Sequence, residues 1–126
     1  MARDTVRFVS LLFSTEAERG DPRAGTPQWQ PATDVYVTSE GWLVKLELAG
    51  VYPEDVELSV TGRTLRVRGR RRDCCLEPGC RQLHMEIAYS RFERQVDLPA
   101  DLDLAQIATE FRHGMLLVRV RREGFA

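Results

Sequence analysis

After residue 33, apolar and polar residues alternate with a period of two, or run apolar over strand lengths, in seven stretches of the chain. Alternation of this kind over five to eight residues is typical of half-buried β-strands. It predicts strands over residues 34–37, 42–48, 56–60, 64–68, 91–98, 107–111 and 115–120. No long helical segment lies between them, which indicates an all-β fold built as an antiparallel β-sandwich.

Short turn signals separate these predicted strands. Glu40-Gly41, Thr61-Gly62-Arg63 and Arg112-His113-Gly114 are compatible with tight hairpins. In the last of them we expect the residue before the glycine to adopt a positive φ as well. Pro53-Glu54-Asp55 predicts a single helical turn, because proline suits a first helical position and acidic residues favour the first turn.

The first 31 residues have a different composition. The spacing of Val6, Val9, Leu12 and Phe13 would place one apolar stripe on a short helix. Residues 15–31 are rich in proline, glycine and polar side chains, which favours a linker. We therefore expect a partly helical or disordered arm and linker over residues 1–31, a β-sandwich over residues 32–122 and a short tail over residues 123–126.

Length and charge restrict the classes of function. The chain has 126 residues, enough for one domain. Its 18 basic and 19 acidic residues nearly cancel, so we expect neither nucleic acid nor a membrane surface as a partner. The apolar run near the start is too short to span a membrane, and no signal-peptide cleavage pattern follows it. Three cysteines close together suit a reducing compartment, and we expect a cytoplasmic protein.

Residues suited to catalysis are scarce. His84 and His113 are the two histidines, and His113 falls in a predicted tight turn. No nucleophile elbow accompanies the five serines, and no glycine-rich phosphate-binding motif is present. We therefore expect a protein that is not an enzyme and that needs no nucleotide or metal cofactor.

A cysteine-rich segment is the most unusual local feature. Cys74, Cys75 and Cys80 are followed by His84, and together they could in principle provide a tetrahedral zinc site. Adjacent cysteines bind one metal poorly, and no second Cys-x-x-Cys is present. The favoured interpretation is exposed thiols in a loop; redox sensitivity and zinc binding remain alternatives.

The densest basic run lies at residues 63–72. Strand alternation would place Arg66, Arg68 and Arg70 on the face opposite Leu65 and Val67. The stripe could meet phosphates, but pairing with acids such as Glu47, Glu57 or Glu93 is the favoured reading because no aromatic residues are interleaved.

Seven segments in order resemble the bacterial type of the small heat-shock protein family, whose members are built on an α-crystallin domain. The segments are Pro31–Tyr36, Val44–Val51, Pro53–Val56, Gly62–Gly69, Tyr89–Arg94, Leu98–Asp101 and His113–Val118. The resemblance implies an immunoglobulin-like sandwich of seven to eight strands, a homodimer or small oligomer, and ATP-independent chaperone activity. Such a holdase would bind apolar segments of unfolding client proteins and limit their aggregation under stress.

The resemblance also implies roles for particular residues. It places a dimer contact at Leu83, His84 and Met85, with Arg94 pairing with acids at the interface. An edge groove would be lined by Val56, Leu58, Val60, Thr109 and Phe111. The expected client-binding arm residues are Val6, Phe8, Val9, Leu11, Leu12 and Phe13.

The sequence departs from the family pattern in three places, of which the first two are compatible with the expected fold and the third changes the expected assembly. Ala49 stands where proline is usual, and Ser90 stands where glycine is common. The Ile-x-Ile-type tail motif is replaced by Glu123–Ala126, so we expect a dimer or small oligomer, with a paralogue as a possible source of the tail. A CS-type co-chaperone module and a regulator acting through the cysteine loop are the alternative functions.

Overall fold

The computed structural model describes residues 29–73 and 77–123, and the predicted client-binding arm at residues 6–13 lies outside them. The described part contains seven strands and one 3₁₀ turn. They are β1 (Thr33–Val37), β2 (Gly41–Glu47), η2 (Pro53–Asp55), β3 (Val56–Thr61), β4 (Thr64–Arg70), β5 (Arg91–Asp97), β6 (Gln106–Arg112) and β7 (Met115–Arg121). The predicted strands and the predicted helical turn are confirmed, with boundaries within one or two residues.

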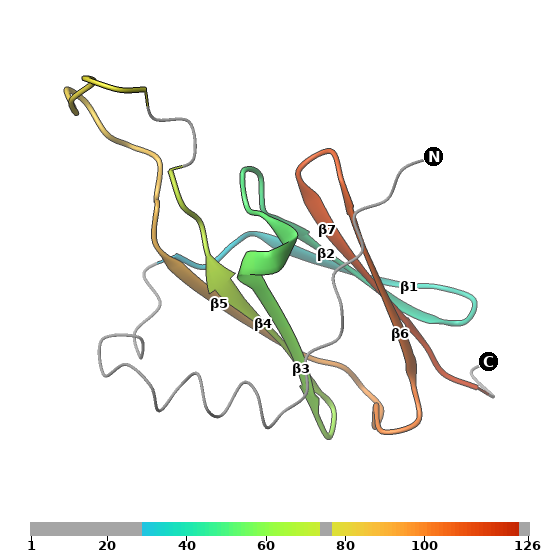
Figure 1. Cartoon of the computed structure of the whole chain (residues 1–126). Coiled ribbons are helices and arrows are strands. Elements are labelled where there is room, and N and C mark those ends of the chain that lie inside the picture. The colour runs from blue at the N-terminus through green and yellow to red at the C-terminus, as the bar shows by residue number, and fades with distance from the viewer. Residues whose placement is uncertain (1–28, 74–76, 124–126) are drawn as a thin grey trace.

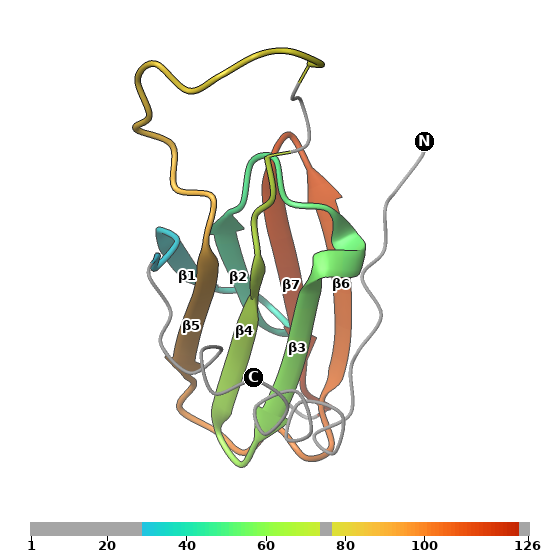
Figure 2. The ribbon, with the colours of Figure 1, turned by 60° about the vertical axis from the view of Figure 1, so that its left-hand side comes forward.

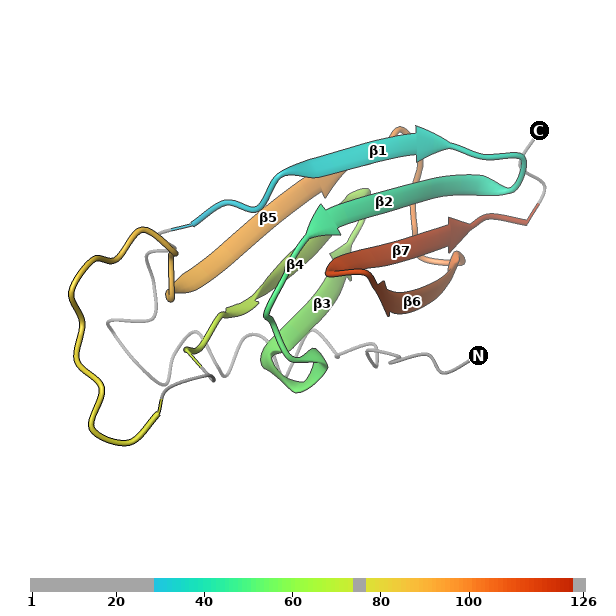
Figure 3. The ribbon, with the colours of Figure 1, turned by 90° about the horizontal axis from the view of Figure 1, so that it is seen from above.

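The strands form two antiparallel sheets that pack face to face (Figures 1 and 3). One sheet has the order β1-β2-β7-β6, and the other has the order β3-β4-β5. The predicted antiparallel β-sandwich is therefore confirmed. In this arrangement β1 and β6 are the edges of the larger sheet, and β3 and β5 are the edges of the smaller one.

The inner faces of both sheets supply the core, as the period-two pattern predicts. Because side chains alternate along each strand, every second residue points inward, and apart from Arg94 on β5 most of these inward residues are apolar. The core cluster is formed by Trp42, Val44, Leu46, Leu48, Val51, Val56, Leu58, Leu65, Val67, Phe92, Leu98, Leu102, Leu116, Val118 and Val120.

Two glycine positions fix the hairpins that set the register. In the β6–β7 turn His113 has φ 52° and Gly114 has φ 76°, so the predicted pair of positive φ values is confirmed. At the start of β2, a Cβ on Gly41 would lie 2.0 Å from the carbonyl oxygen of Val120 on the neighbouring strand. A side chain there would push β2 away from β7.

The packing of the sandwich begins ahead of β1. Trp29 forms a parallel bridge with Phe92, and their rings meet edge to face with centroids 5.4 Å apart. Pro31 is fully buried. These two residues belong to the segment that composition assigns to the linker, and they tie it to β5.

Candidate functional site

A long connection between β4 and β5 projects from one end of the sandwich (Figures 1 and 2). Its described part beyond residue 76 contains four alternating apolar residues whose side chains stay uncovered: Leu83 is 96% exposed, Met85 48%, Ile87 59% and Tyr89 38%. This is the period-two pattern of a strand, yet no strand is formed there. The segment 83–89, here called the apolar segment, includes the predicted dimer residues Leu83, His84 and Met85.

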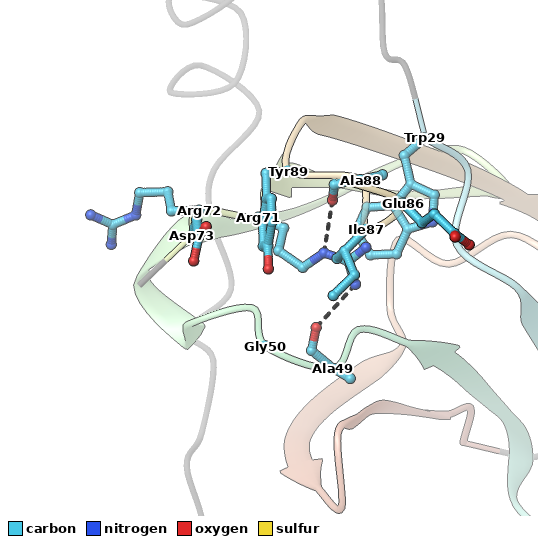
Figure 4. A pocket seen from close by; sticks show the side chains of 10 residues that line it. All are labelled: Trp29, Ala49, Gly50, Arg71, Arg72, Asp73, Glu86, Ile87, Ala88 and Tyr89. Carbon is cyan, nitrogen blue, oxygen red and sulfur yellow. Dashed lines mark hydrogen bonds between the residues drawn. The ribbon is translucent and has the colours of Figure 1, made fainter. Parts of the chain in front are cut away.

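Arg71 holds the base of this connection against the sandwich. Its Nε donates to the carbonyl oxygen of Ala88 at 2.9 Å, and its Nη1 donates to that of Ala49 at 3.2 Å (Figure 4). The guanidinium also lies over the ring of Trp29, 3.9 Å from its centroid. Because these three contacts come from three separate segments, we call Arg71 and its partners the Arg71 clamp.

A cavity of about 600 Å³ lies beside the Arg71 clamp. Its walls come from residues 49–50, from residues 71–73, from Trp29 and from the returning part of the loop at residues 86–89 (Figure 4). The lining is largely apolar, and Ile87 and Tyr89 at its border are also exposed to solvent. The apolar segment therefore continues into a hollow at the side of the sandwich.

The edge strand β1 carries a second uncovered apolar surface. It pairs with β2 on one side, and among the described residues no strand pairs with its other side. Val35 and Tyr36 are exposed, and Val37 is 75% exposed. A free strand edge of this kind presents backbone N–H and C=O groups that another extended segment can pair with.

Arg94 lies on β5, the other strand at this side of the sandwich (Figure 3). It is opposite Val67 in the register, on the inner face with Phe92 and Val96, and it is half-buried. Within residues 29–73 and 77–123 its guanidinium has no hydrogen bond or ion pair. A half-buried cation without an acidic partner among the described residues is suited to meet an acid from a second chain.

The opposite side of the sandwich has β3 and β6 as its edges, and the structure divides the predicted groove residues between core and surface. Val56 and Leu58 belong to the core and are 4% and 0% exposed in the single chain. Thr109 is also buried, whereas Val60 and Phe111 are half-buried. A chain docking at this edge would meet Val60, Phe111 and the backbone of the two strands.

The basic stripe on β4 is largely neutralised by acids. Arg66 donates to Glu93 through Nε and Nη2, both at 3.1 Å, and Arg68 donates to Glu57 at 3.0 Å. The favoured reading of a salt-bridged sheet face is confirmed for these two arginines, through Glu57 and Glu93. It is not confirmed for Arg70.

The candidate redox and metal residues are brought together only in part. Cys80 is a free, exposed thiol in the long connection, and Cys74 and Cys75 lie outside the described residues. His84 is exposed and contacts Glu86. In the described ranges no group of three His, Cys, Asp or Glu side chains could hold a metal ion.

Sequence reasoning missed Trp29 and Arg71. Trp29 stands among prolines and polar residues, and Arg71 is one of several consecutive arginines, so neither interrupts a pattern. A lone aromatic residue shortly before the first strand is the one signal that the sequence offers for this packing.

In the described part of the chain, no helix has the length and apolar character needed to cross a membrane.

Comparison with known proteins agrees with the geometry. The model of the Hsp20/alpha crystallin family matches residues 34–125. Spore protein SP21 of Stigmatella aurantiaca is 31% identical over 75% of this chain and 56% of its own length. Small heat shock protein C2 of Rickettsia felis is 27% identical over 74% of this chain and 60% of its own length. The chain thus matches little more than half the length of these relatives.

A solved structure supports the same assignment. Heat shock protein 16.0 from Schizosaccharomyces pombe superposes with a TM-score of 0.70 at 25% identity, and the match covers 79% of this chain and 92% of that one. The family model covers the observed sandwich from the second residue of β1 to the end of β7. This chain belongs to the Hsp20/alpha crystallin family, the small heat-shock proteins.

Proposed function

We propose that this protein is an ATP-independent holdase that binds apolar segments of unfolding proteins and limits their aggregation. The observation that carries the proposal is the apolar segment 83–89, a strand-like stretch that its own chain leaves uncovered. The family assignment supports a chaperone role, and the free edges of the sandwich offer backbone pairing for extended chains.

Burial of apolar surface provides the driving force for this binding. Each Å² of apolar surface removed from water contributes about 25 cal/mol, so a few large side chains suffice for weak and reversible capture. Apolar contact and strand addition recognise backbone and hydrophobicity instead of one side-chain pattern. The client range is therefore broad, and neither a catalytic group nor a nucleotide takes part.

Self-association is the second part of the proposal. The apolar segment of one chain, with Leu83, His84 and Met85, pairs with the free edge of β1 of a second copy. Arg94 then meets an acid of the partner chain, for which Glu86 in the same segment is suited by its exposure. The assembly is a homodimer or small oligomer, and a paralogue could supply a tail for the β3–β6 edge.

Light scattering from a heat-stressed model client tests the holdase. The protein is added in excess under reducing conditions without nucleotide, and suppression of scattering is expected. An unchanged scattering curve from a protein shown to be folded by circular dichroism would contradict the proposal.

A matched pair of variants tests the expected role of the arm. Phe8→Asp with Phe13→Asp should lose most of the suppression, because two apolar contacts become charged. Ser10→Asp with Ser14→Asp makes the same charge change in the same segment and should retain suppression. Equal loss in both variants would indicate a general charge effect and contradict the apolar mechanism.

A further inference from the structure

The outer face of the β3-β4-β5 sheet carries a ladder of mostly charged side chains, and one cross-strand pair in it has two like charges. Alternation along β4 places Arg66, Arg68 and Arg70 on this face. In the register with β5, Arg68 lies opposite Glu93, but Arg70 lies directly opposite Arg91. The last step of the ladder therefore holds two positive charges on neighbouring strands.

The neighbouring arginines show what this step lacks. Arg66 is held by Glu93, Arg68 by Glu57, and beyond the strand Arg72 donates to Asp55 at 2.8 Å. The side chains of Arg70 and Arg91 have no hydrogen bond or ion pair with any residue in the described ranges, although the Arg91 carbonyl accepts a hydrogen bond from the hydroxyl of Ser90. Arg70 is exposed and Arg91 half-buried, so both residues remain in contact with solvent.

Like charges directly opposite each other in a sheet destabilise it, typically by a few tenths of a kcal/mol up to about 1 kcal/mol. A destabilising pair of like charges that no other residue of the fold offsets is expected where a function requires the two residues. Here the compensation that is missing is a carboxylate, the group that neutralises every other arginine of the stripe.

We propose that Arg70 and Arg91 together form a binding site for a carboxylate side chain of an acidic protein segment. Two guanidinium groups on adjacent strands can each donate to one carboxylate, and charge-assisted bonds of this kind are the stronger class of hydrogen bond. This inference rests on the proposed function, because it takes a protein segment as the ligand. It deepens that function by stating that protein segments with acidic residues are preferred at this face.

The same face disfavours a polyanion such as nucleic acid. Glu57 and Glu93 flank the arginine pair one step along the ladder, and Asp97, which accepts a hydrogen bond from Thr64, lies further along β5. A phosphate backbone laid along the strands would meet these carboxylates. A single acidic side chain would contact only the Arg70–Arg91 pair.

Fluorescence anisotropy of the full chain measures the site directly. The probe is a short fluorescein-labelled peptide in which glutamate alternates with alanine, used at low ionic strength. The same peptide with glutamine in place of glutamate is the control ligand. We expect the glutamate peptide to bind at least about tenfold more tightly than the glutamine peptide, since charge-assisted bonds exceed neutral ones.

The variant Arg70→Glu separates this site from general charge effects. It places a glutamate opposite Arg91, which completes the ladder within the sheet, so the melting temperature should rise by a few degrees while binding of the glutamate peptide falls about tenfold. Arg63→Glu, in the β3–β4 turn at the other end of β4, makes the same change in net charge. It should leave binding within about twofold of the original.

Three outcomes would overturn the inference. Equal losses in the two variants would show diffuse electrostatics, and equal binding of both peptides would show apolar contact alone. In a competition experiment, a single-stranded oligonucleotide and unlabelled glutamate peptide each displace the labelled peptide. If the oligonucleotide did so at the lower concentration, the two arginines would be a binding site for phosphate instead. Light scattering with the original chain separates the proposals: Arg70-dependent peptide binding without suppression of aggregation supports this site and contradicts the holdase.

Discussion

The sandwich and the apolar segment 83–89 use the same period-two pattern and reach opposite outcomes. In the strands, inward residues such as Leu46, Leu58 and Val118 are fully buried between the sheets. In the apolar segment, Leu83, Met85 and Ile87 alternate in the same manner and remain exposed. The difference lies in the partners: each strand has a neighbour in its own chain, whereas the segment projects beyond the sheets (Figure 1). Alternation thus predicts an extended conformation, and the availability of a partner decides burial.

Replacing a core residue of the sandwich should change the free energy of unfolding more than any change in the apolar segment. Phe92→Ala removes a fully buried ring that meets Trp29 edge to face and lies close to Gly69. We expect the free energy of unfolding to fall by about 3–5 kcal/mol, because both the transfer energy and the packing around the cavity are lost. Urea denaturation followed by circular dichroism measures it.

Leu104→Ala is the control for Phe92→Ala. Leu104 is apolar but almost fully exposed, so its removal should change the free energy of unfolding by less than about 0.5 kcal/mol. A small effect for Phe92→Ala, similar to the control, would contradict the described core.

The sequence predicted the sandwich well because the strands carry their own evidence. Inward residues repeat every second position, and turns such as His113-Gly114 have the required residue types. The edge groove rests on the family resemblance and stays a prediction; alternation alone places Val56 and Leu58 on the inner face, where the structure buries them in the core. Arg71 could not be predicted, because its carbonyl partners at residues 49 and 88 are distant in sequence and carry no side-chain signal.

Loosening the Arg71 clamp should give the next largest effect. Arg71→Met keeps the apolar stem but removes the bonds to Ala88 and Ala49 and the contact with the Trp29 ring. We expect a loss of about 1–2 kcal/mol in the free energy of unfolding, since hydrogen bonds from a charged donor are lost from a half-buried site. Hydrogen exchange at residues 86–90 should accelerate more than exchange in β2 or β7.

Arg63→Met provides the matched control for the clamp. It removes an exposed guanidinium from the β3–β4 turn and should leave both stability and loop exchange unchanged. If Arg71→Met and Arg63→Met give the same exchange pattern, the clamp does not hold the loop.

Changing the apolar segment itself should affect association and leave the domain intact. Leu83→Ser removes an apolar side chain that contacts water in the single chain, so the intrinsic stability of the domain should change by less than about 0.5 kcal/mol. The dissociation constant of the dimer, measured by sedimentation over a dilution series, should rise about tenfold, which corresponds to about 1.4 kcal/mol. Leu104→Ser is the control. Equal dissociation constants for both variants would show that Leu83 does not contribute to the dimer interface.

The smallest effect is expected on the charged outer face. Glu93→Gln keeps the shape of the side chain but removes the charge that accepts two hydrogen bonds from Arg66. Because both side chains are partly exposed, the expected loss is about 0.5–1 kcal/mol, and it should shrink at high salt. Urea denaturation at two salt concentrations measures it, with Glu54→Gln as a control that removes one exposed charge outside the ladder.

Glu93→Gln also removes the acid one step from Arg70 and Arg91, so it should tighten binding of the glutamate peptide. Weaker binding would mean that the arginine pair depends on Glu93 for its geometry, and the carboxylate site would then have to include that residue.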